Sequence, residues 1–114
     1  MKKVLIVLDG DDIAPRFDLT LEVLIVSLGK DGKPAGKSDI VLARPSVEAL
    51  CRVVTDENVH TVICGGIEKE HIQYLRWKNV EVIHSVIGPA KVALSRFRKG
   101  GLKSGDILLK ERKA

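Results

Sequence analysis

One short stretch of the sequence gathers residue types that bind metals and anions. Cys64 is followed by the pair Gly65-Gly66, and then by Glu68 and His71. Thiolate and imidazole are ligands for iron, copper and zinc, whereas adjacent glycines can leave backbone amides open to an anion. The pattern places these groups between a buried strand and a helix, at the strand end where ligands collect in α/β proteins. The stretch therefore predicts a binding site, and a ligand-free turn is the alternative.

The cysteines and histidines each allow a structural and a functional interpretation. Cys64 is either a buried strand residue or a metal ligand, whereas Cys51 lies on an apolar helical stripe and is expected in the core. His71 falls on the apolar face of a helix, as a hydrogen-bonded core residue or as a group lining a cleft. His84 has the same ambiguity on a later strand, and His60 is expected at the opposite end, on the surface. No CxxC pair is present, so neither a zinc site nor a thioredoxin-like motif is predicted.

Hydrolytic chemistry lacks the residues that it needs. Asp9, Asp11 and Asp12 could hold a hard cation. Two-metal nucleases of the ribonuclease H-like fold also require a carboxylate after the fourth strand, where this chain has Cys64-Gly65. The sequence contains no phosphate-binding loop and no G-x-S-x-G turn. A hydrolase using Asp9 and His71 therefore stays only as a third alternative, and the protein is not expected to be an enzyme.

The elements that position these residues follow from hydrophobic periodicity. Continuous or alternating apolar runs predict strands at 3–8, 21–28, 38–43, 60–64 and 80–87. Helical stripes predict helices after Pro45, over 67–77 and after Pro89, the last ending at Gly100-Gly101. The order is β-β-β-α-β-α-β-α, with a polar loop over 9–18. It predicts an α/β fold with a five-stranded mixed sheet, a hairpin of strands two and three, later strands parallel to the first, and helices packed on the sheet.

Composition limits the classes of partner. The 114 residues are expected to form a single domain, 1–114, with a basic tail at about 103–114. The net charge is +4, and residues 91–114 carry eight Lys or Arg against Asp106 and Glu111. Four scattered aromatic residues do not form a base-stacking platform, so nucleic acid is not the favoured partner. No apolar run approaches the ~20 residues of a membrane span. Two cysteines and no evident export signal predict a cytoplasmic protein.

Several motifs together resemble a known family. Ile13 to Asp18 (IAPRFD) is similar to an early Ser-Pro-(Arg/His)-Phe-Gly-like element, with Ala14 in place of serine and Asp18 in place of glycine. Further matches are Gly65-Gly66-Ile67, the strand at 80–83, and an Ala-Leu…Phe…Gly-x-Leu pattern at 93–102. In this order and spacing, the chain resembles the dinitrogenase iron–molybdenum cofactor biosynthesis family, meaning NifX-like proteins and the C-terminal domain of NifB.

This resemblance implies a ribonuclease H-like fold that binds an anionic metal–sulfide cluster, either iron–sulfur or molybdenum-containing, as a carrier or assembly partner. It places the cluster against Pro15, Arg16, Phe17, Gly65, Gly66 and Glu68, with Cys64, His71 or His84 as metal ligand. A cluster-donor or cluster-acceptor protein is the implied partner, and the oligomeric state is left open. The alternative is a ligand-free interaction module that docks an acidic protein or nucleic acid through its basic C-terminal region.

Overall fold

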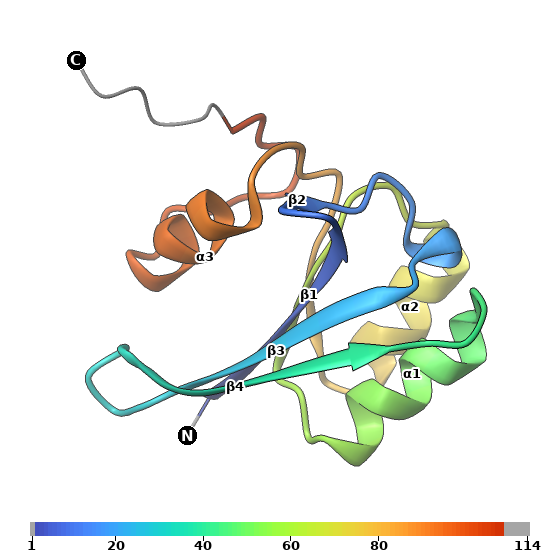
Figure 1. Ribbon diagram of the computed structural model, residues 1–114, viewed down its shortest axis with the longest axis horizontal. Helices are drawn as coiled ribbons and strands as arrows, with labels where there is room; N and C mark the ends of the chain where they lie inside the picture. The colour runs from blue at the N-terminus through green and yellow to red at the C-terminus, as the bar shows by residue number, and fades with distance from the viewer. Residues whose placement is uncertain (1, 109–114) are drawn as a thin grey trace.

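The computed structural model describes residues 2–108, which form one mixed sheet and three α-helices (Figure 1). The elements are β1 (Lys2–Asp9), β2 (Asp12–Ile13), the 3-10 helix η1 (Phe17–Leu19), β3 (Glu22–Leu28), β4 (Pro34–Val41), α1 (Val47–Asp56), β5 (Thr61–Ile63), α2 (Lys69–Trp77), β6 (Glu81–Ile83) and α3 (Ala90–Arg98). The predicted α/β class and the three helices are confirmed. None of these helices is long and apolar enough to cross a membrane.

The sheet has the order β4-β3-β1-β5-β6, with β2 paired to β1. β3 is antiparallel to both β1 and β4, whereas β5 is parallel to β1 and β6 is parallel to β5. The predicted hairpin and the predicted parallel crossovers are therefore confirmed. The parallel alignment brings the carboxyl ends of β1, β5 and β6 to the same edge of the sheet.

The core lies on both faces of β1, where Val4 to Val7 are fully buried. α1 and α2 cover one face of the sheet and α3 lies on the other, as Figure 1 shows. A central strand covered on both sides needs apolar residues at consecutive positions, which explains the unbroken run in the sequence.

The sheet has six strands among the described residues, and the expectation of five is wrong. The additional strand is β2, which pairs with the end of β1 through Leu8↔Ile13 and Asp9↔Asp12. Gly10, at φ +64°, permits the tight turn between them. The sequence predicted only a polar loop here, because two residues are too few to show the alternation of a strand.

The first half of the predicted basic tail belongs to the fold. The Ile87 amide donates to the Asp106 carbonyl at 3.0 Å, and the Leu108 amide donates to the Ile87 carbonyl at 2.7 Å. Leu108 is buried. Residues 103–108 thus continue from α3 back to the segment after β6. The rest of the predicted tail, 109–114, lies outside the described residues.

Candidate functional site

Three loops meet at the carboxyl ends of the parallel strands and are joined by backbone hydrogen bonds. The Gly66 amide donates to the Pro15 carbonyl at 2.7 Å, and the Phe17 amide donates to the Gly66 carbonyl at 2.8 Å. The Ser85 amide donates to the Gly65 carbonyl at 2.8 Å. The loop after β5 is therefore fixed against the loop after β2 and the loop after β6.

This close contact accounts for glycine at position 65. A Cβ on Gly65 would clash with the carbonyl oxygen of Ala14 and lie 2.8 Å from that of Pro15. At Gly66 the nearest atom, the Pro15 oxygen, would be 3.2 Å away. The backbone that approaches these glycines is the protein's own, and the Gly66 amide is already bonded. The open amides expected from the sequence are not found at Gly66.

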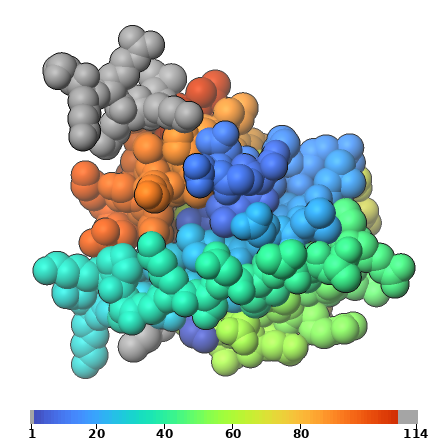
Figure 2. All heavy atoms as spheres, in the orientation of Figure 1, coloured from blue at the N-terminus to red at the C-terminus, as the bar shows by residue number. Residues whose placement is uncertain are grey.

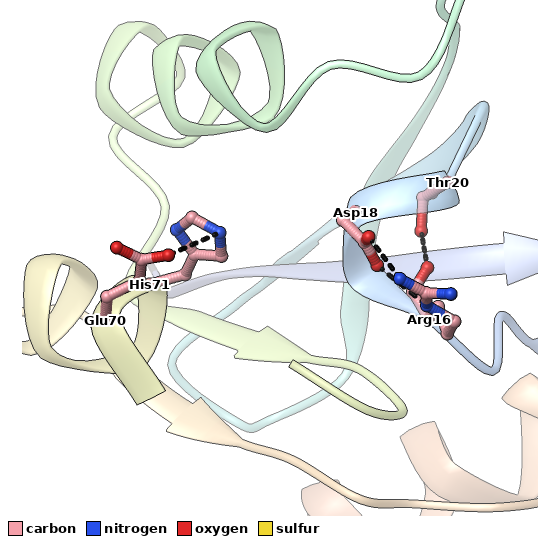
Figure 3. A network of polar contacts seen from close by, with 5 residues as sticks. All are labelled: Arg16, Asp18, Thr20, Glu70 and His71. Carbon is pink, nitrogen blue, oxygen red and sulfur yellow. Dashed lines mark hydrogen bonds and ion pairs between the residues drawn. The ribbon is translucent and has the colours of Figure 1, made fainter. Parts of the chain in front are cut away.

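Arg16 lies in the same loop with its charge already paired. Its Nε donates to Asp18 Oδ1 at 3.1 Å, and its Nη2 donates to Asp18 Oδ2 at 2.6 Å (Figure 3). The Thr20 hydroxyl donates to the Arg16 carbonyl at 2.9 Å and fixes the backbone of η1. The Arg16 side chain remains 60% exposed, so a competing anion can reach it from solvent.

Cys64 is a core residue in this structure. It is fully buried at the end of β5. Burial raises the pKa of its thiol to about 12, because the thiolate would be desolvated. At neutral pH Cys64 is therefore a neutral, inaccessible thiol, which is a poor starting point for metal ligation.

His71 has the geometry of an accessible ligand. It lies in the first turn of α2, which begins at Lys69, two residues later than the sequence predicted. Its side chain is 24% exposed, and its ring centroid is 6.5 Å from that of Phe17. One donor atom from each of Glu68, Glu70 and His71 lies within 4.8 Å of the other two. Figure 3 shows Glu70 and His71 side by side on α2.

This group borders a groove between α1 and α2 with a volume of about 680 Å³. His71 and Tyr74 line it from α2, and Cys51 lines it from α1. Cys51 packs against the core but is only half-buried, so the expectation of a core cysteine is met in part. Partial burial raises the pKa of its thiol. The sequence did not predict that Cys51 lines the groove, because the apolar stripe of α1 does not show that α2 leaves the edge of that stripe uncovered.

His84 does not belong to the group formed by Glu68, Glu70 and His71, and it bonds to other residues. It follows β6, with its Nδ1 2.9 Å from the Ser85 hydroxyl, and its amide donates to the Ser104 hydroxyl at 3.0 Å. Within residues 2–108, only Glu68, Glu70 and His71 bring three potential metal donors so close together. Among the described residues, Cys64, His84 and the aspartates of the 9–12 turn form no such group. His60, expected on the surface, is exposed at the other end of the sheet, where its Nδ1 accepts from the Lys3 amide.

No protein-family model matches the sequence, and no curated protein matches it. Solved structures do match. A "putative dinitrogenase" from Methanococcus jannaschii is 26% identical, with a TM-score of 0.73 over 90% of this chain and 92% of that one. A protein named PH0822 is 18% identical, with a TM-score of 0.80 over 90% and 93%. A "putative NifB protein" from Thermotoga is 16% identical, with a TM-score of 0.71 over 98% and 100%.

The Methanococcus jannaschii protein, named as a dinitrogenase, agrees with the family resemblance that the sequence motifs carry. At 18% and 16% identity, PH0822 and the Thermotoga protein show the shared fold alone. The Methanococcus jannaschii protein is also similar in sequence, at 26% identity over 90% of this chain.

Proposed function

We propose that this chain binds an anionic metal–sulfide cluster, iron–sulfur or molybdenum-containing, and carries it as cargo during cofactor assembly without catalysing a reaction. The likeness to a protein named as a dinitrogenase supports the assignment to this class of function. The observation that carries the proposal is His71, a partly exposed imidazole at the edge of a groove, beside the carboxylates of Glu68 and Glu70.

His71 is the metal ligand in this proposal. Imidazole binds iron and related metals as the neutral ring, and a 24% exposed side chain can reach a ligand without unfolding α2. Of the other two candidates, Cys64 would first have to leave the core, and His84 is not in the group of close metal donors that Glu68, Glu70 and His71 form. Cys51 offers a sulfur donor on the opposite wall of the groove.

The groove has room and mixed charge for such cargo. Its volume of about 680 Å³ is in the range of small-molecule sites. Glu48, Asp56 and Glu70 line it together with the cations Arg52 and Lys78. The two cations offset part of the charge of an anionic cluster. The three carboxylates repel that charge and can favour the cargo only as ligands of its exposed metal atoms.

The loop of Pro15, Arg16 and Phe17 supplies a second contact in this proposal. Phe17 joins the two parts, because its ring packs near His71 while its amide is bonded to Gly66. Asp18 already neutralises the charge of Arg16, so an anion has to compete with this carboxylate for the guanidinium. Gly65 and Gly66 then act by holding this loop in place rather than by binding cargo themselves.

The same proposal includes a ribonuclease H-like classification, a cytoplasmic location and a cluster-donor or cluster-acceptor protein as partner. The test is anaerobic purification after expression beside a functioning cluster-assembly system, followed by analysis of iron, molybdenum and acid-labile sulfide. We expect visible absorbance and a fixed ratio of metal to protein, reduced in His71→Ala and unchanged in His60→Ala. Colourless, metal-free wild-type protein that also fails to take up isolated cluster would contradict it.

A ligand-free interaction module is the second candidate, and the surface of α3 favours it. Lys91, Arg96 and Lys99 are exposed on or next to this helix, and none of them forms an ion pair within the described residues. Such a basic surface attracts acidic partners in a salt-dependent way. Retention on an acidic protein or on DNA that falls with salt and with charge removal at these positions would favour this alternative.

A further inference from the structure

β4 is an edge strand whose outer side is open. It pairs with β3 on one side, and within residues 2–108 no strand pairs with the other. Seven of its eight residues are exposed. Figure 2 shows this strand, cyan to green, running along the visible face with no other element over it.

The register with β3 fixes which backbone groups of β4 point outward. The Leu42 amide donates to the Leu21 carbonyl at 2.7 Å, so this flanking pair is hydrogen-bonded. Hydrogen-bonded and non-hydrogen-bonded pairs alternate along an antiparallel ladder. Ile40 and Ser38 therefore bond toward β3, whereas Lys37, Asp39 and Val41 direct their amides and carbonyls away from the sheet.

The charges on this outer edge are complementary to themselves. Lys37 and Asp39 lie two residues apart, so their side chains share one face of the sheet. When a second β4 pairs antiparallel about a two-fold axis at Ser38, Lys37 of each copy lies opposite Asp39 of the other. Both positions already point their backbone groups outward, so each facing pair can exchange two hydrogen bonds.

Neighbouring two-fold registers lose this match. An axis at position 37 places two lysines opposite each other, and an axis at position 39 does the same with two aspartates. Like charges directly opposite are destabilising, whereas opposite charges contribute roughly 0.2–1 kcal/mol for each pair. A lone edge lysine discourages pairing in many proteins, but Asp39 cancels that effect in the register centred on Ser38.

We propose that β4 is a homodimerisation surface, on which the β4 strand of a second copy pairs antiparallel with the axis at Ser38. The two sheets then form one continuous sheet. This inference rests on the edge of the sheet alone and is independent of cluster binding.

Charge reversal tests both the surface and the register. Sedimentation analysis of wild type, Lys37→Asp, Asp39→Lys and the double variant should give dimers for wild type and for the double variant. Each single variant should associate at least about tenfold more weakly, because two attractive pairs become repulsive. An equimolar mixture of the single variants should form dimers again, since the two carboxylates on the edge of one variant then face the two lysines on the edge of the other.

A disulfide gives a second measurement of the same register. In this arrangement the two Ser38 residues form a non-hydrogen-bonded pair with Cα atoms about 4.5 Å apart, which is within disulfide reach. Oxidised Ser38→Cys should form a covalent dimer, whereas Asp31→Cys in the hairpin turn should not. A wild type that stays monomeric up to millimolar concentration, or dimers that persist in both single variants, would overturn the proposal.

Discussion

The carboxylate of Asp18 holds the guanidinium of Arg16 in a two-point contact, with bonds of 3.1 Å at Nε and 2.6 Å at Nη2. Such an exposed pair contributes only about 0–1 kcal/mol to folding. The pair matters more for binding. Arg16 is the only basic residue of the loop over 9–18, and Asp18 neutralises its charge before any anion binds.

Replacing Asp18 should therefore strengthen anion binding. Asp18→Asn removes the competing charge, and we expect the affinity for an anionic metal–sulfide cluster to rise about two- to fivefold at low salt. Titration followed by visible absorbance measures it. Asp31→Asn makes the same change of charge in the β3–β4 turn and serves as the control. An unchanged or weaker affinity in Asp18→Asn would show that Arg16 does not contact the cluster.

Gly65 should tolerate no side chain, because its Cβ would meet the carbonyl groups of Ala14 and Pro15. We expect Gly65→Ala to lower the free energy of unfolding by about 1–3 kcal/mol, the usual cost of overpacking. Gly101→Ala, where the nearest atom would be 3.9 Å away, is the matched control. Equal denaturation midpoints for the two variants would mean that the contact between the loops is looser than described.

The two cysteines should differ in reactivity. Cys51 lines the groove, whereas Cys64 is fully buried. We expect a thiol reagent to modify one cysteine per native chain, identified as Cys51 by mass spectrometry, and to reach Cys64 only in denaturant. Rapid native labelling at Cys64 would contradict its place in the core.

Cys64 should also make stability depend on pH in the alkaline range. Its thiol titrates near 9.0 when exposed and at about 12 in the fold. As the pH rises, the unfolded chain therefore loses this proton first. The contribution of Cys64 to the free energy of unfolding is complete below pH 9 and declines as the pH rises toward 12. The free energy of unfolding should fall by about 1.4 kcal/mol for each pH unit from this group. Cys64→Ala should lack this component, and equal slopes in both proteins would contradict the assignment.

Periodicity predicted the helices and the five longer strands. Four of these strands bury apolar side chains, whereas β4, predicted at 38–43, spans Pro34–Val41 with seven of its eight residues exposed. Periodicity did not predict β2, which has two residues and forms because Gly10 returns the chain onto β1. It also extended the last strand to position 87, although the chain leaves the sheet after Ile83 to bond with residues 104–108. Alternation of apolar residues continues there because Val86 is still buried.

The sequence predicted only those features of the candidate site that depend on local spacing along the chain. The sequence predicted that His71 and Glu68 lie close together, because they are three residues apart at the start of one helix. The depth of Cys64, the exposure of Cys51 and the pairing of Arg16 with Asp18 depend on how separate elements pack. Residue type and spacing do not determine those contacts.

The central claim is that His71 ligates the metal of a bound cluster. The most direct measurement is anaerobic titration of the apo-protein with an isolated metal–sulfide cluster, comparing wild type, His71→Ala and His60→Ala by visible absorbance and metal stoichiometry. His60 is exposed at the opposite end of the sheet, so its removal controls for loss of a histidine. We expect saturable uptake by wild type and His60→Ala, and loss of the cluster's characteristic absorbance in His71→Ala. Uptake by His71→Ala equal to that of wild type, or no uptake by wild type, would contradict the claim.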